Sequence, residues 1–311
     1  MNILLKNVSG VLEGNFNYLS QIFSKSPNCF RFLSHDGMRI FFSKEISSDF
    51  VKSLNSFLEI SFSNKNSLLK LTKTRSVATG TLPQSNSNDK KIFIKKYIVK
   101  SRLKGIVNLI SPSKAWREMY VGMKLINCGI PTAKPLLVGE KISNSQLKES
   151  YFITEEIPDA QPFISFIKQE SFQKEKKEVL FKLANFVSWV HSKGLWHPDL
   201  SPKNILVSNI NGNDLKLFVL DVDGGIFLKN ISIWKRAKNL TQLFRHVGHF
   251  FTEEDKTFLI DSYCNVSNSI PADKLWKYLQ KVKFYSILKD KQKSFEKAFF
   301  KKKKSNFWQK D

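Results

Sequence analysis

Residues 196–207 read WHPDLSPKNILV, and this stretch decides the fold class. It holds His197, Asp199 and Asn204 in the order H-x-D-x-x-x-x-N, the spacing of a catalytic loop for phosphoryl transfer. In such a loop the Asp orients and deprotonates an acceptor hydroxyl, and the Asn holds a metal ion. The alternative is a polar turn that leads into the apolar strand at 205–207. Partner residues in the expected order, before and after the loop, favour the catalytic interpretation.

Length and composition indicate a globular chain with a strong positive charge. Its 311 residues, 41% of them hydrophobic, suffice for two packed lobes. No apolar run approaches the ~18–20 residues of a membrane span, and the start does not resemble a signal peptide, so we expect a cytoplasmic protein. The three cysteines are too far apart to indicate a disulfide framework or a zinc site.

The net charge of +23 comes from 50 Lys and Arg against 27 Asp and Glu. Such an excess attracts polyanions, which include nucleic acid, anionic lipid and phosphorylated substrates. The alternative is a lysine-rich composition that covers every surface without a function. Charge alone does not choose among these partners.

A strand lysine precedes the loop. Residues 68–82 and 91–99 alternate as two strands joined by a polar linker, and Lys95 ends the sequence IFIK. This sequence has the form of the V-A-I-K strand, whose lysine contacts the nucleotide phosphates. Thr79-Gly80-Thr81 occupies the position of a glycine-rich phosphate loop, but one glycine falls well short of G-x-G-x-x-G. A solvated surface lysine is the alternative for Lys95.

A helix with an inward-facing glutamate follows. Ser111 as N-cap and Pro112 at the first position predict a helix over 113–127. Glu118 shares a face with small and apolar residues, namely Ala115, Gly122 and Leu125. Because a carboxylate on such a face needs a cation, we expect an ion pair with Lys95 that positions the nucleotide phosphates.

The stretch 151–157 has the pattern of a hinge between two lobes. A strand at 151–154 runs into two glutamates and an isoleucine. In such a hinge the carbonyl of Glu155 and the amide of Ile157 would bind the adenine edge, with Thr154 at the entrance of the pocket. A long helix over 174–193, ended by Gly194, then delivers the chain to the loop.

A carboxylate that could bind a metal ion follows the predicted catalytic loop. Strands at 205–207 and 215–220 flank Asn211-Gly212, a strong hairpin signal, and the second strand ends at Asp221. Mg²⁺ prefers oxygen ligands from one or two carboxylates and the phosphates themselves. Asp221 is therefore the predicted metal ligand beside Asn204, and Asp223 is the alternative.

The segment after Asp221 excludes a typical protein kinase. About a dozen residues separate it from the helical stretch at 234–247, and no A-P-E sequence occurs. A protein kinase needs a longer segment there to hold a peptide substrate. Pro198 also occupies the position of the arginine that reads a regulatory phosphate.

Several stretches between 69 and 247 resemble the bacterial lipopolysaccharide core kinases, which phosphorylate Kdo (3-deoxy-D-manno-octulosonic acid) or heptose with ATP. These stretches are IFIKKY, SKAWREMYVGMKLINCGIPTAKPLLVGEK, SYFITEEIPDAQPF, HSKGLWHPDLSPKNILV, VLDVDGG and NLTQLFRHV. The WRE and GIP elements are more specific to that family than the catalytic loop. The resemblance implies the roles given above for Lys95, Glu118, Asp199, Asn204 and Asp221. Pro198 in place of Gly and Arg245-His246 in place of Arg-Ser depart from the family pattern.

We therefore predict an α+β, two-lobed protein-kinase-like fold with a small β-rich N-lobe and a mostly helical C-lobe. The predicted divisions are an N-terminal extension with short strands and a helix (1–60), the N-lobe (61–154), the C-lobe (155–280) and a basic aromatic tail (281–311). The expected cofactors are ATP and Mg²⁺. The expected catalytic residues are His197, Asp199 and Lys203.

The predicted activity is phosphorylation of a sugar hydroxyl, Kdo or heptose, in the lipopolysaccharide inner core. The alternatives are another small-molecule or protein kinase of the same fold, and a basic non-catalytic nucleic-acid binder or pseudokinase. A filled set of catalytic positions disfavours the binder. The expected partners are a lipid-linked sugar acceptor and an anionic membrane surface, without nucleic acid, for a monomeric protein.

The C-terminal tail suggests where the protein works. Residues 281–311 hold eleven lysines and three acidic residues, a net charge of +8, and aromatic residues flank the lysine run at 301–304. Lysines beside aromatic residues suit the surface of an anionic membrane. We expect a peripheral protein on the cytoplasmic face of the inner membrane, with a solvated tail as the alternative.

Overall fold

The computed structural model describes residues 30–83, 89–210, 214–245, 247–267 and 270–285. These residues divide into two compact units. The first holds the residues up to Ala160 and takes in two later returns of the chain, at 208–210 and 218–224. The second holds the remaining residues. The first unit thus includes residues 30–60 of the predicted extension, and its first segment ends at Ala160, six residues after the predicted boundary at 154.

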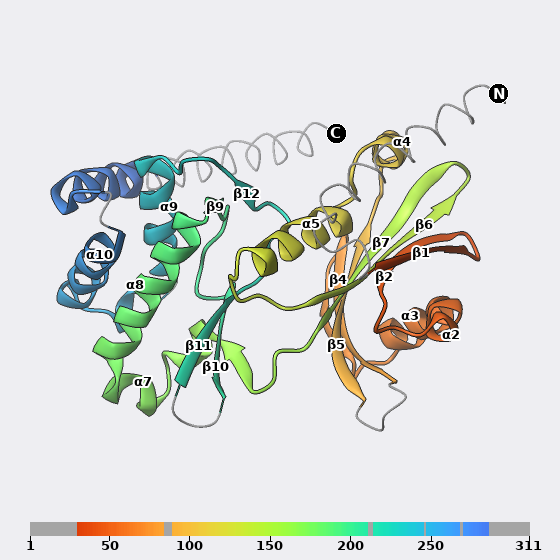
Figure 1. Ribbon diagram of the computed structural model, residues 1–311, viewed down its shortest axis with the longest axis horizontal. Helices are drawn as coiled ribbons and strands as arrows, with labels where there is room; N and C mark the ends of the chain where they lie inside the picture. Colours follow the sequence, from red (N-terminus) through yellow and green to blue (C-terminus); the bar gives the residue numbers. More distant parts are fainter. Residues whose placement is uncertain (1–29, 84–88, 211–213, 246, 268–269, 286–311) are drawn as a thin grey trace, which may run out of the picture. The chain divides into compact units, whose positions relative to one another are not determined.

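The first unit is built on one seven-stranded antiparallel sheet (Figure 1). Its strands follow the order β1-β2-β6-β7-β5-β4-β3. Their bounds are β1 (Phe30–His35), β2 (Met38–Ser43), β3 (Leu68–Leu71), β4 (Arg75–Leu82), β5 (Lys90–Ile98), β6 (Pro135–Ser143) and β7 (Gln146–Glu155). The turn between β6 and β7 is the two residues Asn144 and Ser145, both at positive φ. Strand β7 therefore begins five residues before the strand predicted at 151–154.

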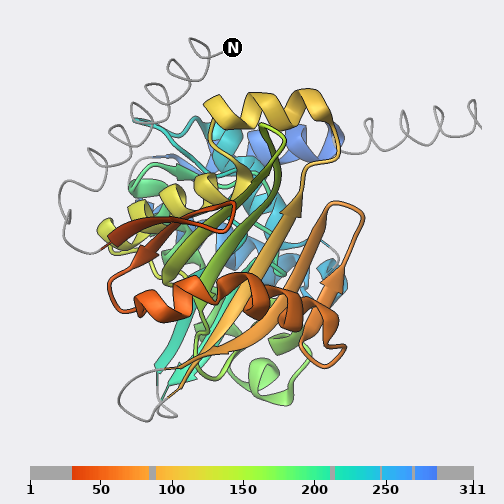
Figure 2. The same cartoon turned by 90° about the vertical axis from the view of Figure 1, so that its right-hand side faces the viewer.

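Alternating side chains give the sheet two apolar faces. Ile92 and Ile94 of β5 belong to one core, with α2 (Ser48–Lys52) and α3 (Leu54–Ser63), which Figure 2 shows against the sheet in orange. Tyr97 belongs to the other core, with α5 (Lys114–Asn127). Because successive strand residues point to opposite faces, Lys95 lies on the same face as Tyr97, toward α5.

Helix α5 begins two residues later than its predicted cap. Ser113, not Ser111, is the N-cap, and its side chain accepts from the amide of Trp116 at 3.4 Å. Ser111 instead ends α4 (Arg102–Ile110) in an extended conformation, with ψ of 150°. The residue before a proline is forced out of the helical region, which explains why Pro112 separates the two helices.

Gly80 is not part of a phosphate loop. It lies within β4, opposite Ile92 of β5. A Cβ at this position would come within 2.7 Å of Cζ of Phe57, so the glycine makes room for an α3 side chain. The turn between β3 and β4 lies earlier, at 72–74, and contains no glycine.

The second unit is mostly helical. Its helices are α6 (Phe163–Phe166), α7 (Glu170–Lys174), α8 (Lys176–Ser192), α9 (Ile233–Leu243) and α10 (Glu253–Ser267), and residues 272–285 are also helical. The remaining strands of the described residues are β8 (Ala160–Pro162), β9 (Leu195–Trp196), β10 (Ile205–Ile210), β11 (Asp214–Val219) and β12 (Ile226–Phe227). They form a sheet of order β11-β10-β8 and a β12-β9 pair. The predicted hairpin turn at Asn211-Gly212 lies outside the described residues.

Gly194 ends helix α8 as predicted and turns the chain toward the predicted catalytic loop. Its φ is +83°, and a Cβ there would come within 2.3 Å of the carbonyl oxygen of Leu228. Only glycine fits this position without a backbone shift. Within the described part of the chain, no helix is long and apolar enough to cross a bilayer.

Candidate active site

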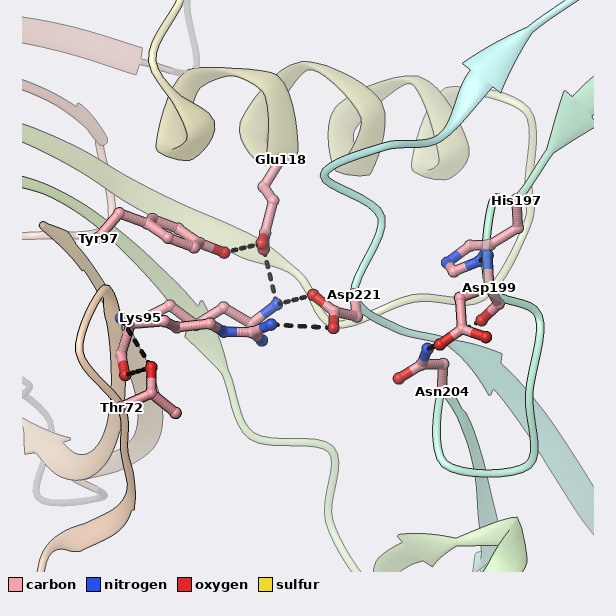
Figure 3. Close-up of polar contacts among 9 residues, drawn as sticks. Thr72, Lys95, Tyr97, Glu118, His197, Asp199, Asn204 and Asp221 are labelled. Carbon is pink, nitrogen blue, oxygen red and sulfur yellow. Dashed lines mark hydrogen bonds and ion pairs between the residues drawn. The ribbon is translucent and has the colours of Figure 1, made fainter. Parts of the chain in front are cut away.

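The ion pair predicted between Lys95 and Glu118 is present in the first unit (Figure 3). Nζ of Lys95 lies 2.7 Å from Oε2 of Glu118. The glutamate side chain is 1% exposed and the lysine side chain 17%. Each buried charge depends on the other, since loss of one partner leaves an uncompensated charge away from water.

Tyr97 fixes the other oxygen of this carboxylate. It lies two residues after Lys95 on the same face of β5, and its hydroxyl donates to Oε1 of Glu118. Burial first, and then the charge of Glu118, raise the pKa of Tyr97 far above its usual value, so the phenol remains a donor at neutral pH. With a donor on each oxygen, the carboxylate of Glu118 has a single favoured orientation.

Of the two candidate aspartates, the structure brings Asp221 to the lysine. Oδ1 of Asp221 lies 3.6 Å from Nζ of Lys95, and Oδ2 lies 3.0 Å from Nη1 of Arg75. The φ of Asp221 is 57°, a left-handed conformation that is uncommon outside glycine and that concentrates at functional sites. Asp223 is half-buried and makes no hydrogen bond or ion pair to any described residue.

Arg75 belongs to this cluster although the sequence did not single it out. It is the first residue of β4, after the turn at 72–74. The hydroxyl of Thr72 accepts from the amide of Arg75 at 3.0 Å and donates to its carbonyl at 2.7 Å, which closes the turn. Burial opposes the charge of Arg75, but hydrogen bonding and attraction to Asp221 outweigh it and raise the pKa of Arg75 above its usual value.

The expected hinge residues continue from β7. Thr154 is buried and lies opposite Phe93 of β5. The amide of Glu155 donates to the carbonyl of Lys134 at 2.9 Å. The backbone amide of Ile157 has no acceptor among the described residues, so it is open to a ligand or to water.

The predicted catalytic loop, in the second unit, has a defined internal geometry (Figure 3). Nδ2 of Asn204 donates to the backbone carbonyl of Asp199 at 2.8 Å and lies 3.3 Å from Oδ2 of its side chain. The amide of Asp199 donates to Nδ1 of His197 at 3.1 Å, and His197 is 1% exposed. The histidine thus supports the backbone of the aspartate from below the surface.

Helix α9 anchors the loop through two buried amides. Asn239 donates to the carbonyl of His197 at 2.6 Å and accepts from its amide at 3.4 Å. Gln242 accepts from the amide of Leu200 at 3.1 Å and donates to the carbonyl of Pro198 at 2.7 Å. Four backbone groups around Asp199 therefore bind side chains of one helix, which holds the loop in one conformation.

Two cations belong to the exposed side of the loop. Nη1 of Arg245, two residues beyond α9, lies 2.7 Å from Oδ1 of Asp199. These side chains are 46% and 49% exposed. Lys203 is exposed, and its ammonium contacts no described acceptor, so the structure does not join it to the other predicted catalytic residues.

Five residues of these clusters have no role predicted from the sequence. They are Arg75, Tyr97, Asn239, Gln242 and Arg245. The sequence held a signal for Asn239, Gln242 and Arg245, because these polar residues recur at intervals of three in NLTQLFR. No local pattern marks Arg75, because its partner lies 146 residues away.

Three comparisons show which known proteins this chain resembles. Residues 59–263 match the sequence profile of the lipopolysaccharide kinase (Kdo/WaaP) family. Cyclin-dependent kinase 11 of Dictyostelium discoideum is 28% identical over 162 residues, which are 50% of this chain and 43% of that protein, so the chain spans less than half of this relative.

The third comparison concerns the fold. A solved structure, WaaP in complex with acyl carrier protein, is similar with a TM-score of 0.54 and 16% identity, over 79% of this chain and 97% of that one. This similarity confirms the predicted fold class, with a β-rich N-terminal part and a helical C-terminal part.

Proposed function

Since the chain belongs to the lipopolysaccharide kinase (Kdo/WaaP) family, we propose that it transfers the γ-phosphate of ATP to a sugar hydroxyl of the lipopolysaccharide inner core. The observation that supports this most strongly is the buried pair of Lys95 and Glu118 with Asp221 at the same lysine. A non-catalytic binding protein has no need of a charged cluster inside its first unit. A phosphotransferase needs it to orient the nucleotide.

The first unit supplies the proposed nucleotide-binding residues. Lys95, oriented by Glu118, would contact the phosphates. Thr154, the carbonyl of Glu155 and the open amide of Ile157 would contact the adenine. Arg75 adds a second cation next to Asp221. The turn at 72–74 has hydroxyls and a lysine where other kinases have glycines.

The proposed metal ligands fit Mg²⁺ by their chemistry. Because Nδ2 of Asn204 donates to the carbonyl of Asp199, the other side-chain atom, Oδ1, is left as an oxygen donor. Asp221 supplies a carboxylate. Mg²⁺ prefers such oxygen ligands together with phosphate oxygens. When bound, it would neutralise charge that develops on the phosphates.

Asp199 is the proposed proton acceptor. As the acceptor oxygen bonds to the γ-phosphorus, the hydroxyl proton passes to the carboxylate of Asp199. The bond between that phosphorus and the bridging oxygen breaks, and the electron pair leaves with ADP. A positioned general base contributes ~10²- to 10⁴-fold to such a step.

Arg245 favours Kdo over heptose as the acceptor. Kdo is an acid, whereas heptose is neutral. An exposed guanidinium next to Asp199 offers a carboxylate a two-pronged partner beside the reacting hydroxyl. The similar solved structure is WaaP in complex with acyl carrier protein, so we add a carrier protein to the proposed partners.

The decisive experiment measures phosphate transfer from labelled ATP to lipid-linked Kdo, beside a generic protein and an aminoglycoside. Transfer to Kdo alone is expected. Asp199→Asn should remove most turnover and still bind ATP, because the nucleotide contacts lie in the first unit. Equal activity of the Asp199→Asn protein, or preferred labelling of the protein or the aminoglycoside, would contradict the proposal. Preferred labelling of the protein or the aminoglycoside would favour the alternative function, a small-molecule or protein kinase of the same fold.

We also propose a peripheral location on the cytoplasmic face of the inner membrane, where a lipid-linked acceptor is accessible. The support is the charge and aromatic content of residues 281–311, of which 286–311 lie outside the described residues. Binding to anionic liposomes should weaken with added salt and with truncation after Val282. Unchanged binding of the truncated protein would remove the tail from the mechanism.

A further inference from the structure

Helix α4 (Arg102–Ile110) turns aliphatic side chains toward solvent. Leu103, Ile106 and Val107 are 77%, 49% and 52% exposed. Their spacing of three and four places them on one face of the helix. A surface helix of a globular protein normally buries such a stripe against the core. In α4 this arrangement is inverted.

The buried side of α4 explains the inversion. Gly105 lies two residues from both Leu103 and Val107, and therefore on the opposite side of the helix. It is buried against β7, and a Cβ there would come within 3.0 Å of the carbonyl oxygen of Leu147. Because a Cβ at Gly105 would crowd this carbonyl, the helix packs closely on β7 at its glycine, and Leu103, Ile106 and Val107 stay outside.

Cations stand on both sides of the aliphatic face. Arg102 and Lys104 flank Leu103, and Lys100 precedes the helix. All three cations are exposed, and none forms an ion pair with a described residue. The whole stretch 99–117 contains no Asp or Glu. The surface thus combines exposed aliphatic area with uncompensated positive charge.

We propose that α4 is a membrane-contacting helix that lies in the headgroup region of an anionic bilayer, with Leu103, Ile106 and Val107 toward the acyl chains. A bilayer offers anionic headgroups and hydrocarbon in successive layers, which matches cations that flank an aliphatic stripe. An acidic protein would have to bring an apolar patch of its own as well. The inference rests on the membrane location proposed above and adds a second contact, independent of the tail and of the acceptor sugar.

Hydrogen exchange of the full-length protein tests the proposal without ATP or acceptor. Peptides that cover 101–111 should gain protection when vesicles of phosphatidylglycerol and phosphatidylcholine are added, and not with pure phosphatidylcholine. The Leu103→Ser/Val107→Ser protein should lose this protection and bind anionic vesicles about tenfold or more weakly, since burial of even one aliphatic side chain contributes that much.

Matched variants separate the helix from other surfaces. Ile60→Ser/Leu69→Ser removes two aliphatic side chains of similar exposure, 67% and 58%, outside α4, and should bind as the unmodified protein does. Equal vesicle binding by the Leu103→Ser/Val107→Ser protein would overturn the proposal and leave the tail as the membrane contact. Protection of 101–111 before vesicles are added, or with soluble polyglutamate in their place, would assign the face to another part of the chain or to an acidic protein.

Discussion

The guanidinium of Arg245 lies 2.7 Å from Oδ1 of Asp199, while Nδ2 of Asn204 lies 3.3 Å from Oδ2. Both oxygens of the proposed proton acceptor therefore have a donor before an acceptor sugar binds. A hydroxyl must share the carboxylate with these donors. A sugar that carries its own carboxylate can also compete for Arg245, so this arginine is placed to distinguish acidic from neutral acceptors.

We expect Arg245→Gln to lower kcat/KM for Kdo by roughly 10- to 100-fold, the value of one charge-assisted hydrogen bond, and to leave KM for ATP unchanged. The loss for a neutral heptose acceptor should be smaller. Arg245→Lys should recover part of the Kdo activity, because it keeps the charge but not the planar fork. Steady-state kinetics with both sugars measure this, and an equal loss for both would show that Arg245 does not read acceptor charge.

The second prediction concerns the nucleotide cluster. Lys95→Met and Glu118→Gln should each lower kcat/KM for ATP by ~10²-fold or more, since each leaves its partner poorly compensated. The double variant should be no worse than the poorer single variant, because the two side chains act as a unit. Independent, multiplying effects would show that the pair has no functional role.

Lys96→Met provides the control for that cycle. Lys96 follows Lys95 in β5 but pairs with Glu149 at 2.7 Å, and both side chains are partly exposed, at 21% and 23%. Its replacement should leave ATP kinetics near those of the unmodified protein, because its side chain lies on the opposite face of β5 from Lys95. A comparable loss of ATP kinetics would mean that the effect of Lys95→Met comes from charge on the strand in general.

The third prediction concerns α9 as the anchor of the catalytic loop. Asn239→Ala leaves the backbone amide and carbonyl of buried His197 without these partners, which should cost about 2–3 kcal/mol of stability. It should lower kcat more than it raises KM for ATP. Thr241→Ala, which removes a hydroxyl that bonds only within α9, is the matched control. A similar fall in Tm and kcat for both variants would argue against a specific anchor.

The family, the fold class and the Lys95–Glu118 pair could all be predicted from the sequence. Each depends on a local pattern: the motif spacing, the alternation of β5 and the apolar stripe of α5. The pair joins residues of two different elements, and its prediction used one further argument. A buried carboxylate needs a cation nearby, and Lys95 was the candidate. The family profile confirms the predicted family.

Other features could not be predicted because their cause lies far away in the sequence. Gly80 was interpreted as a loop glycine, but it lies in β4, where its lack of a side chain leaves room for the ring of Phe57. The role of Arg75 follows only from the structure, in which this first residue of β4 forms an ion pair with Asp221. The tail at 286–311, for which membrane contact was predicted, lies outside the described residues, and that prediction remains to be tested.

The last prediction concerns His191, which contacts Asn239, the residue that bonds to the predicted catalytic loop. It is buried, and its ring contacts Tyr263 through Nδ1 at 2.8 Å and Asn239 through Nε2 at 3.1 Å. Arg236 also donates to the hydroxyl of Tyr263 at 2.8 Å. The hydroxyl of Tyr263 therefore donates to Nδ1, and neutral His191 donates from Nε2 to Asn239. Protonation of Nδ1 would point a second ring N–H at the donating hydroxyl of Tyr263. It would also place a positive charge near Arg236.

Burial is the main cause that lowers the pKa of His191 from 6.5 to about 4, and the charge of Arg236 adds to it. Because the folded pKa lies below the unfolded one, this residue stabilises the fold fully above pH 6.5, and the contribution is lost as the pH falls toward 4. The loss should reach about 3 kcal/mol. Urea unfolding at pH 8 and pH 4.5 measures it, with His191→Gln as the reference that lacks the titrating group. Equal acid destabilisation of both proteins would show that carboxylates elsewhere, and not His191, set the acid limit.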